Sequence, residues 1–416
     1  MTSNTLRVAV VGGSIAGCTA AVALRRQGHA VRVFERSPGG LVGRGAGIIA
    51  PEPVIEAMQG RDLLDADLPG FRAERLVNSA RADDGGRLGR SPWAAPVAIR
   101  LLRWQDLYAS LRRRLPDADI EYGRPVTDAR HVGDGREVEL AVDGSPAGRF
   151  DLVVFADGYR SLGRGLMFPG ARLEYTGIAG LRGLLPERYL TDTAPLEGAL
   201  HRVRYPEGHF VFYLVPGEGG AMAPGERVVN WGVYLRVPAA ELDDLLTDDA
   251  GERGFGSVPF GAVPRDRVER LRRFLAPHLP PYFADIALSG HNSHALQAMF
   301  TMTLPGYRRG RMCLAGDAGM IAPPFTGSGV FKGMTNAVAL ADALAATDDT
   351  DAALAGWDRE QTATGLSQLR LGERLADALI WHIPDFAAMS EADMVDWWER
   401  ASKFPEAVWG GGDRPA

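Results

Sequence analysis

The sequence has almost no lysine, very little cysteine and no long uncharged apolar run. Lys332 and Lys403 are the only lysines among 46 basic residues, a bias that reflects a GC-rich genome more than a function. Cys18 and Cys313 are the only cysteines, and both fall in apolar segments, so a disulfide framework is excluded and a reducing cytoplasm is favoured. The longest stretch without a charged residue, 286–307, contains histidine, asparagine and proline, so it is not a membrane span.

An excess of positive charge is also missing. The net charge is -6, which argues against nucleic acid or an anionic membrane as the main partner. The first expected strand begins at Arg7, which leaves no room for a signal peptide before it and favours a cytoplasmic location. With 416 residues, 46% hydrophobic and 24% charged, the chain has the composition of a globular protein large enough for two domains or one large composite.

Residues 7–36 predict the first half of a dinucleotide-binding βαβ unit. A β-run is followed by the turn GGSIAG, a helical segment and a second β-run. Gly12 allows the sharp exit from the strand and Gly17 lets the helix pack closely, so that the N–H groups at the helix N-terminus are free to bind a pyrophosphate. Ser14 replaces the middle glycine of G-x-G-x-x-G, which weakens the motif without cancelling it.

Glu35 ends the second β-run, at the place where an acid accepts hydrogen bonds from an adenosine ribose. Because an acid there leaves no evident site for a 2′-phosphate, the pattern fits FAD or NAD better than NADP. The alternative is a glycine-rich loop between a strand and a helix that binds no ligand.

The rest of the chain predicts an antiparallel β-layer inserted into this α/β unit. Strand-like runs predominate between about 171 and 304, at 198–204, 209–215, 227–237 and 295–303, with one helix at 265–275. Helices are also expected at 53–64, at 101–115 with Arg103 at its start, at 330–346 and at 357–379. The sequence therefore predicts an α/β (α+β) protein with a Rossmann-like nucleotide-binding domain, an inserted antiparallel sheet and C-terminal helices.

Three nucleotide-type segments stand in order along the chain: GGSIAG at 12–17, ADGYRS at 156–161 and LAGDAGMIAPPFTGSG at 314–329. Together they resemble the single-component (class A) FAD-dependent aromatic hydroxylases of the p-hydroxybenzoate hydroxylase fold, over nearly the whole chain. The resemblance implies three regions: an FAD-binding domain of residues 1–70, 101–170 and 305–346, a substrate domain of 71–100 and 171–304, and a C-terminal helical region of 347–416.

The resemblance also implies contacts to FAD. It makes Gly12, Ser14 and Gly17 the pyrophosphate turn, and it places Glu35 and Arg36 at the adenosine ribose. The other implied contacts are Arg44 and Arg103 to the FAD, Val126 to adenine through its backbone, Asp157 in an Asp-Gly motif shared with a transient pyridine nucleotide, Asp317 to the ribityl chain, and Gly327 and Gly329 under the isoalloxazine ring.

The physical chemistry of the third segment agrees with that implication. Asp317 follows a strand, so its carboxylate is able to accept from ribityl hydroxyls, although a turn or N-cap aspartate is the alternative. Gly327 and Gly329 let backbone amides approach the flavin N1 and C2 carbonyl, and the helix that follows directs its N-terminal dipole at charge that builds there on reduction. One departure is Met320, which stands where the family usually has histidine.

On the substrate side, the run 209–215 has two alternating sets of side chains. We favour the set with Tyr213 and His209 over the set with Phe210, Phe212 and Leu214, because a site that orients an ionisable ring needs a few placed polar groups. Further candidates are His291, His294, Gln297 and, in the loop under the isoalloxazine ring, Pro324. For each of them the alternative is a structural or surface side chain.

The implied activity is NAD(P)H-dependent hydroxylation. In the family, FAD is reduced by NADH or NADPH once substrate is bound, and O2 then forms a flavin C4a-hydroperoxide that hydroxylates a small electron-rich aromatic or N-heteroaromatic ring. Residues 210–237 and Lys332 resemble the dihydroxypyridine hydroxylase branch. The alternatives are a halogenase, an epoxidase or a reductase on the same scaffold, or an FAD-binding protein without activity.

No metal is expected, because the H-x-x-H of His291 and His294 is a weak pattern with no suitable carboxylate beside it except Asp285. The expected partners are a small aromatic substrate and O2. The sequence leaves open the substrate's identity, the choice between NADH and NADPH, and whether the protein is a monomer or a homodimer.

Overall fold

The protein, for which we use a computed structural model, is described over residues 5–41, 45–83 and 86–402. Its first βαβ unit agrees with the prediction: β1 is Arg7–Val11, α1 is Ile15–Arg26 and β2 is Ala30–Glu35. Apolar residues of β1 and β2 are buried, and α1 packs on them through its small residues. The helix was expected to follow the GGSIAG turn and so to begin at Cys18. It begins three residues earlier, because Ile15 to Gly17 are already helical.

A six-stranded sheet with the order β17-β18-β10-β1-β2-β6 contains this unit. The strands β18, β10, β1, β2 and β6 run parallel, and β17 is an antiparallel edge. Their bounds are β6 Ile120–Tyr122, β10 Leu152–Phe155, β17 Arg308–Arg309 and β18 Met312–Leu314. Because parallel strands end at one edge, the segments that follow β1, β2, β10 and β18 all meet there.

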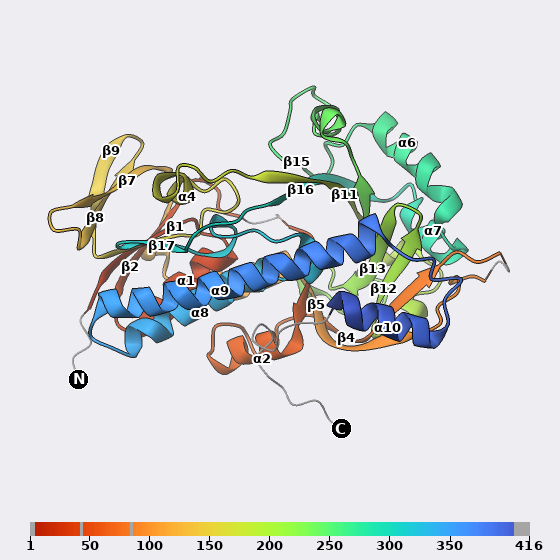
Figure 1. Ribbon diagram of the computed structural model, residues 1–416, viewed down its shortest axis with the longest axis horizontal. Helices are drawn as coiled ribbons and strands as arrows, with labels where there is room; N and C mark the ends of the chain where they lie inside the picture. The colour runs from red at the N-terminus through yellow and green to blue at the C-terminus, as the bar shows by residue number, and fades with distance from the viewer. Residues whose placement is uncertain (1–4, 42–44, 84–85, 403–416) are drawn as a thin grey trace.

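Helices cover one side of this sheet and a small antiparallel sheet covers the other (Figure 1). The helices are α1, α3 (Trp104–Arg112), α8 (Gly329–Ala345) and α9 (Thr350–Ala376), and the small sheet contains β7 (Val126–Val132), β8 (Glu137–Val142) and β9 (Ser145–Phe150). Gly333 brings α8 close to α1, since a Cβ there would lie 2.6 Å from the Cβ of Ala16. On the opposite side, Phe34 meets Phe150 edge-to-face at 6.0 Å.

The second large sheet has nine strands in the order β15-β16-β11-β14-β13-β12-β4-β5-β3. It is antiparallel except for the parallel pair β12 and β4. Its strands are β3 Gly47–Pro51, β4 Phe71–Ala80, β5 Ala94–Arg103, β11 Glu174–Pro186, β12 Ala199–Tyr205, β13 Gly208–Val215, β14 Val228–Arg236, β15 Ser257–Val258 and β16 Ser293–Thr301. The sheet curls on itself. Although β3 and β14 are far apart in the strand order, the backbone N–H of Gly47 in β3 donates to the Asn230 side chain of β14 at 2.8 Å.

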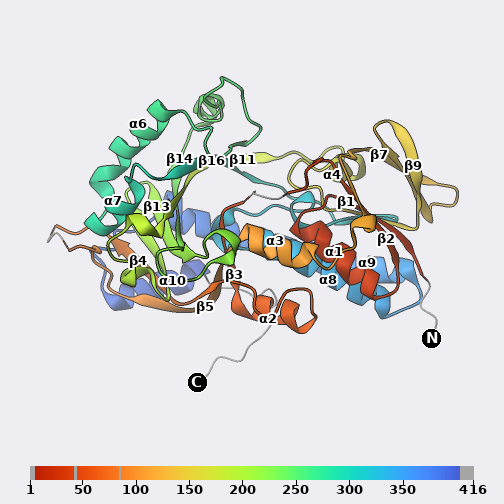
Figure 2. The same ribbon diagram turned by 180° about the vertical axis from the view of Figure 1, so that it is seen from behind.

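The two faces of this sheet differ. We call the outer face the one that packs against α6 (Arg265–Leu275) and α7 (Pro281–Ala287), which lie outside the sheet in Figure 1 and Figure 2. The inner face is the opposite one, which packs against α9, the π-helical turn Asp377–Trp381 and α10 (Glu391–Ser402). Residues of α9 run from the six-stranded sheet to the nine-stranded sheet and connect the two halves (Figure 1).

Several predicted boundaries were wrong. The helix expected over 101–115 begins at Trp104, because Leu101 to Arg103 complete β5 by pairing with β3. The helix expected at 53–64 is α2, Glu52–Gly60, and α9 begins seven residues before the predicted Trp357. The long strand β11 was missed. The remaining short helices are α4 Leu162–Met167 and α5 Leu242–Leu245.

The predicted fold class is confirmed, and the strands and the helix predicted between 198 and 303 lie within two residues of their expected bounds. The domain limits stay a prediction. One observation refines them: β3 pairs with β5 in the nine-stranded sheet, although residues 47–51 were expected in the nucleotide-binding domain. In the described part of the chain, no helix is both long enough and apolar enough to cross a membrane.

Candidate active site

The glycine turn after β1 is built for close backbone approach. Gly12 has φ +101°, and a Cβ on it would lie 2.5 Å from the carbonyl oxygen of Ala156; a Cβ on Gly17 would lie 1.9 Å from the Gly12 oxygen. Glycine is therefore required at both ends of the turn. Ser14 is the N-cap of α1 but its side chain makes no capping bond, so the first N–H groups of the helix are left for another acceptor.

Glu35 lies against this turn. Its buried carboxylate accepts from the backbone N–H groups of Gly13 and Ser37, at 2.8 Å each. These two bonds hold the acid at the end of β2, beside the glycine turn, as the sequence predicted. Arg36 follows it and is exposed, and the backbone N–H of Arg124, two residues before Val126, bonds to the Glu35 carbonyl at 3.0 Å.

Asp157 follows β10 at the same edge of the sheet. Its Oδ2 accepts from the Leu162 N–H at 2.7 Å, whereas its buried Oδ1 has no partner in the described structure. Burial raises the pKa of this carboxyl. An acceptor atom that is buried without a donor at a sheet edge indicates a group that the protein is built to receive.

Asp317 lies in the turn after β18 and does not cap a helix. Its Oδ1 pairs with Lys332 Nζ at 3.1 Å, and the same ammonium donates to the Met320 carbonyl at 2.5 Å. Arg164 joins this turn to the ADGYRS segment, because it donates to the carbonyls of Asp317 and Ala318 and to that of Tyr159. The three predicted segments are thus connected at one edge.

The loop 323–329 carries the site towards the inner face of the nine-stranded sheet. Gly327 has φ +65°, a left-handed conformation that favours glycine, and it lies near the Ile49 carbonyl of β3. Phe325 packs against two inner-face side chains, Tyr234 at 4.8 Å and His209 at 5.8 Å between ring centroids. Pro324 and Gly329 are in the same loop, and the position of Gly329 is open.

Tyr213 and His209, the set that we favoured for the site, lie on the inner face, whereas Phe210, Phe212 and Leu214 lie in the outer-face core. Tyr213 is buried next to Asn230, and burial raises the pKa of its hydroxyl. The pKa of His209 is lowered well below its usual value, first by burial and then by the charge of Arg202, so the ring is neutral.

The tautomer of His209 follows from its hydrogen bond. Nδ1 lies 3.2 Å from the Leu379 carbonyl, which only accepts, so Nδ1 carries the hydrogen. Nε2 therefore presents a lone pair. A neutral imidazole fixed in this form is able to accept a hydrogen bond or a proton.

The structure does not bring His294 to this site. It lies on the outer face, where its ring meets Trp231 edge-on at 5.9 Å beneath α6. The prediction failed because strand alternation places His294 with Leu296, two residues on, in the outer-face core. His291 is exposed and stacks on Tyr189 at 3.8 Å, and Gln297 is exposed on β16.

Of the remaining predicted FAD contacts, Arg103 and Val126 are in the structure and one is not described. Arg103 ends β5 opposite Gly47 and donates to the Gly217 carbonyl, which places it at the junction of the two large sheets. Val126 begins β7 and is half-buried. Arg44 lies outside the described residues. Among the residues described, no three His, Cys, Asp or Glu side chains are grouped as a metal site would require.

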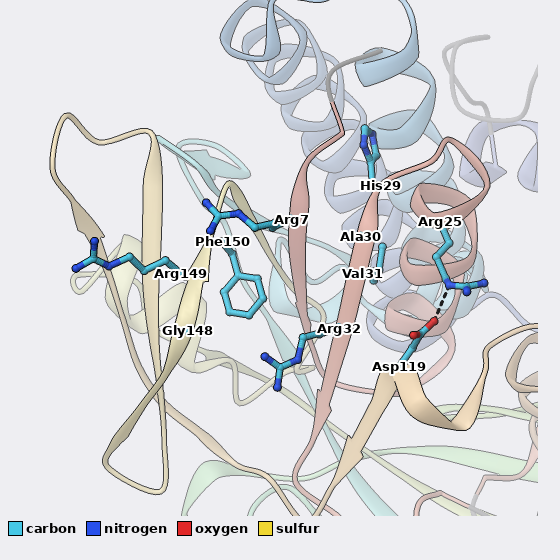
Figure 3. Close-up of a pocket in the computed structure, with 10 residues that line it drawn as sticks. All are labelled: Arg7, Arg25, His29, Ala30, Val31, Arg32, Asp119, Gly148, Arg149 and Phe150. Atoms are coloured by element: carbon cyan, nitrogen blue, oxygen red, sulfur yellow. Dashed lines mark ion pairs between the residues drawn. The ribbon is translucent and has the colours of Figure 1, made fainter. Parts of the chain in front are cut away.

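The cavity drawn in Figure 3 is not at this site. It has a volume of about 390 Å³ and lies at the opposite edge of the six-stranded sheet, where β1 and β2 begin. Arginines surround it, but each has an acid partner, as the ion pair of Arg25 and Asp119 at 2.5 Å in Figure 3 illustrates.

Comparison with known proteins agrees with these features. Residues 10–49 match the NAD(P)-binding Rossmann-like domain family, residues 175–295 the FAD binding domain-like family and residues 269–362 the FAD binding domain family. The chain is 27% identical to 2,6-dihydroxypyridine 3-monooxygenase of Paenarthrobacter nicotinovorans, over 91% of this chain and 93% of that protein. It is 26% identical to 3-amino-4-hydroxybenzoate 2-monooxygenase of Streptomyces cremeus, over 94% and 92%.

The fold is shared with a solved structure, 2,6-dihydroxypyridine-3-hydroxylase from Arthrobacter nicotinovorans, with a TM-score of 0.82 and 24% identity over 91% of this chain and 94% of that one. The chain is a homologue of the class A FAD-dependent hydroxylases. The predicted enzyme class, an FAD-dependent monooxygenase, is thereby confirmed. A second similar structure is Klebsiella pneumoniae HpxO complexed with FAD and uric acid, with a TM-score of 0.71 and 18% identity over 96% and 94%.

The residues of this hydroxylase homologue fit FAD. Gly12 and Gly17 keep the turn free of side chains, Asp157 holds a buried acceptor without a donor, and Asp317 presents a half-exposed carboxylate. Two arginines on the inner face, Arg182 and Arg202, were not predicted. Their signal was weak, because arginine is the default basic residue of this chain and β11, which carries Arg182, was missed.

Proposed function

We propose that this protein is a monooxygenase that uses FAD, NADH or NADPH, and O2 to hydroxylate a small electron-rich aromatic or N-heteroaromatic ring. Bound FAD would supply the redox chemistry: it accepts reducing equivalents from the pyridine nucleotide and activates O2 for transfer of one oxygen atom. The predicted contacts to FAD, together with the hydroperoxide route that the resemblance implies, remain part of this proposal.

The observation that carries it is the meeting of the two sheets. Phe325, in the loop 323–329 that follows β18 of the six-stranded sheet, packs on Tyr234 of the inner face at 4.8 Å between ring centroids. A group held at the edge of the six-stranded sheet therefore faces polar side chains of the nine-stranded sheet. A nucleotide site alone would not need that second surface.

On the cofactor side, each residue has a defined task. Glu35 and the α1 N-terminus would hold the ribose and pyrophosphate, and Asp317 would accept from ribityl hydroxyls while Lys332 fixes its carboxylate. The N-terminus of α8 would stabilise negative charge on the reduced ring system.

On the substrate side, Tyr213 and His209 would orient the ring and move its proton. His209 Nε2 has the lone pair needed to accept a proton from a ring hydroxyl, and both His209 and Tyr213 are buried, which limits the access of water to them. Pro324 would shape the loop beside the ring. Similarity to the 2,6-dihydroxypyridine 3-monooxygenase favours the dihydroxypyridine hydroxylase branch.

The purified protein should be yellow and should release FAD on heating or acid treatment. Oxygen uptake with NADH or NADPH should be slow alone and should rise when a hydroxylated ring such as 2,6-dihydroxypyridine or a hydroxybenzoate is added. A colourless protein that does not take up FAD would contradict the proposal. Halide-dependent chemistry in place of hydroxylation would move the protein to the halogenase class.

The two cysteines also fit the proposed setting. Cys18 and Cys313 are buried and unpaired, and burial raises the pKa of both thiols to about 12. Thiols of that kind are inert towards oxidation and disulfide exchange. We infer from them a protein that works in a reducing compartment such as the cytoplasm.

A further inference from the structure

The buried arginines of this protein differ in how their charge is satisfied. Among the described residues, five of the six buried arginines reach a carboxylate or at least two backbone carbonyls. Four pair with an acid: Arg100 with Glu52, Arg227 with Glu187, Arg311 with Asp351 and Arg267 with Asp244. Arg267 also donates to the carbonyls of Leu245 and Thr247, and Arg164 donates to three carbonyls. The sixth, Arg202, has no acid and no carbonyl. It is 7% exposed.

What Arg202 lacks is a negatively charged acceptor. One of its N–H groups donates to Asn78 Oδ1 at 3.0 Å, and its guanidinium lies over the Trp398 ring at 4.9 Å. Its Nε is buried without a partner, and so is the amide nitrogen of Asn78. A guanidinium only donates hydrogen bonds, so the side-chain oxygen of Asn78 must be the atom that faces Arg202. The Asn78 atom left without a partner is therefore its NH₂ group, which is a donor.

Arg182 adds a second cation to the same face. It lies on β11 and is half-buried, next to Gly232, where a Cβ would be 3.9 Å from the Arg182 Cγ and 3.7 Å from Val211. In the described part of the chain it forms no ion pair or hydrogen bond. Val211 and Tyr234, on neighbouring interior strands, are half-buried as well. Interior strands are covered by their neighbours at the edges, so this partial exposure shows that part of the inner face is open.

Tyr234 connects the two arginines. Arg182 and Arg202 lie in one row across the sheet, because Arg182 is opposite Gly232 and Arg202 is opposite Val211, which in turn is opposite Gly232. Tyr234 lies two residues from Gly232 on the same face, and the charges of both arginines oppose the rise that burial causes in the pKa of its hydroxyl. Its ring packs on Phe325 of the loop 323–329 and on His209. The two unpaired cations are therefore part of the surface that faces the proposed flavin.

We propose that the inner face recognises an aromatic ring that carries a carboxylate, with Arg182 and Arg202 as the cationic groups that receive it and Asn78 as an additional donor. The inference rests on the proposed function, because it names the substrate class of that site. A buried permanent cation needs a permanent anion, and a ring hydroxyl with a pKa of about 10 is mostly neutral at pH 7. A planar carboxylate also matches the geometry of a guanidinium.

The test compares ligands that differ only in charge. Calorimetric titration of the full-length protein with 4-hydroxybenzoate and 4-hydroxybenzamide, and with salicylate and salicylamide, measures the preference for a carboxylate. At least one acid should bind about 10-fold or more tightly than its amide. Equal affinity within every pair, including no detectable binding of either member, contradicts the proposal.

Three variants assign the preference to residues. Arg182→Gln and Arg202→Gln should each reduce the preference for the acid towards 1, with little change for the amide. Arg75→Gln removes the same charge from the opposite face of the sheet, where Arg75 is exposed, and should keep the preference. A preference that survives both inner-face changes overturns the assignment.

Thermal unfolding separates this role from a structural one. Because Arg202 is a buried cation without a counterion, Arg202→Met should leave the melting temperature unchanged or raise it, whereas Arg227→Met should lower it by removing the partner of buried Glu187. A fall with Arg202→Met as large as that with Arg227→Met would show a structural arginine and contradict the proposal.

Failure of this inference is distinguishable from failure of the proposed function. If FAD-dependent oxygenation of 2,6-dihydroxypyridine occurs and no acid is preferred over its amide, the monooxygenase assignment stands and the carboxylate site does not. If a carboxylate binds through Arg182 and Arg202 but no ring is oxygenated, the carboxylate site stands and the monooxygenase assignment does not.

Discussion

The outer and inner faces of the nine-stranded sheet come from the same strands but have opposite chemistry. On β13, Phe210 and Phe212 point outwards into an aromatic core with Trp231 and Phe283, at centroid distances of 4.8 to 6.2 Å. Their neighbours His209 and Tyr213 point inwards among arginines and asparagine. Alternation along a strand thus lets one segment serve both stability and chemistry.

The difference lies in which polar groups are satisfied. Buried ions that support the architecture have matched partners, as with Arg227 and Glu187 at 2.7 Å. On the inner face, Arg202 and Asn78 keep donors without acceptors. Other buried polar atoms also lack a partner, for example on His294 of the outer face, but Arg202 differs from them because it is a buried cation without a counterion.

The largest expected effect is on the outer face. Phe212→Ala should lower the free energy of unfolding by about 3 to 5 kcal/mol, because a fully buried ring is removed from a packed core. Tyr213→Phe, one residue away, removes only a hydroxyl and should cost about 1 kcal/mol or less. Urea unfolding of both variants measures the two free energies of unfolding. Equal losses of stability would contradict the view that the outer face stabilises the fold more than the inner face does.

The next effect concerns the cofactor edge. Asp317→Ala should weaken FAD binding by about 1.5 to 3 kcal/mol, because it removes a charged acceptor for ribityl hydroxyls. It also leaves Lys332 buried beside the Met320 carbonyl alone, so the melting temperature should fall as well. FAD fluorescence measures the affinity, and Asp342→Ala, a surface acid paired with Arg61, serves as the control. Unchanged affinity would make Asp317 a turn residue only.

Much of this arrangement was predictable. Local signals were enough for β1, β2 and the three glycine- and aspartate-containing segments, because turn glycines and strand ends depend on neighbouring residues. The alternation of β13 predicted two sets of side chains, and the set with His209 and Tyr213 is on the face where His209 packs on Phe325. Their role in catalysis stays a prediction.

The failures came from long-range contacts. Gly177, Gly180 and Gly183 hid β11, because a glycine is a poor strand former unless a neighbour fills its place, as the Trp231 ring does over Gly183. His294 was named as a candidate for the site although it lies on the outer face, because only its packing against α6 and Trp231 decides its side. The same limit hid Arg202, whose lack of a counterion is visible only in three dimensions.

A smaller effect is expected at the reacting surface. His209→Gln should lower turnover by about 10- to 100-fold, because it removes the lone pair that accepts the ring proton, and it should shift the pH dependence of kcat while FAD stays bound. His294→Gln, on the outer face, is the matched control and should leave kcat and its pH profile unchanged. A steady-state pH series on both variants decides whether the inner face alone takes part in the chemistry.

The smallest effect is the pH dependence of stability. Burial lowers the pKa of His201 and His294 to about 4, and it lowers the pKa of His209 well below its usual value. Below an unfolded pKa of about 6.5 the unfolded chain binds protons that the folded chain does not. Stability is therefore complete above pH 6.5 and falls as the pH drops towards 4, by up to about 1.4 kcal/mol per pH unit for each histidine. Urea unfolding at pH 7.5 and 5.5 measures the loss, which His201→Gln should reduce; stability that rises on acidification would contradict the burial of these rings.

The central claim, that the cofactor edge and the inner face act together on a ring, is tested most directly with labelled oxygen. The FAD-loaded protein is given NADH or NADPH, a hydroxylated ring that stimulates oxygen uptake, and ¹⁸O₂, and the product is examined by mass spectrometry. We predict that one labelled oxygen atom enters the ring and that His209→Gln reduces its yield. A product without label, or label that enters only hydrogen peroxide, would contradict the claim.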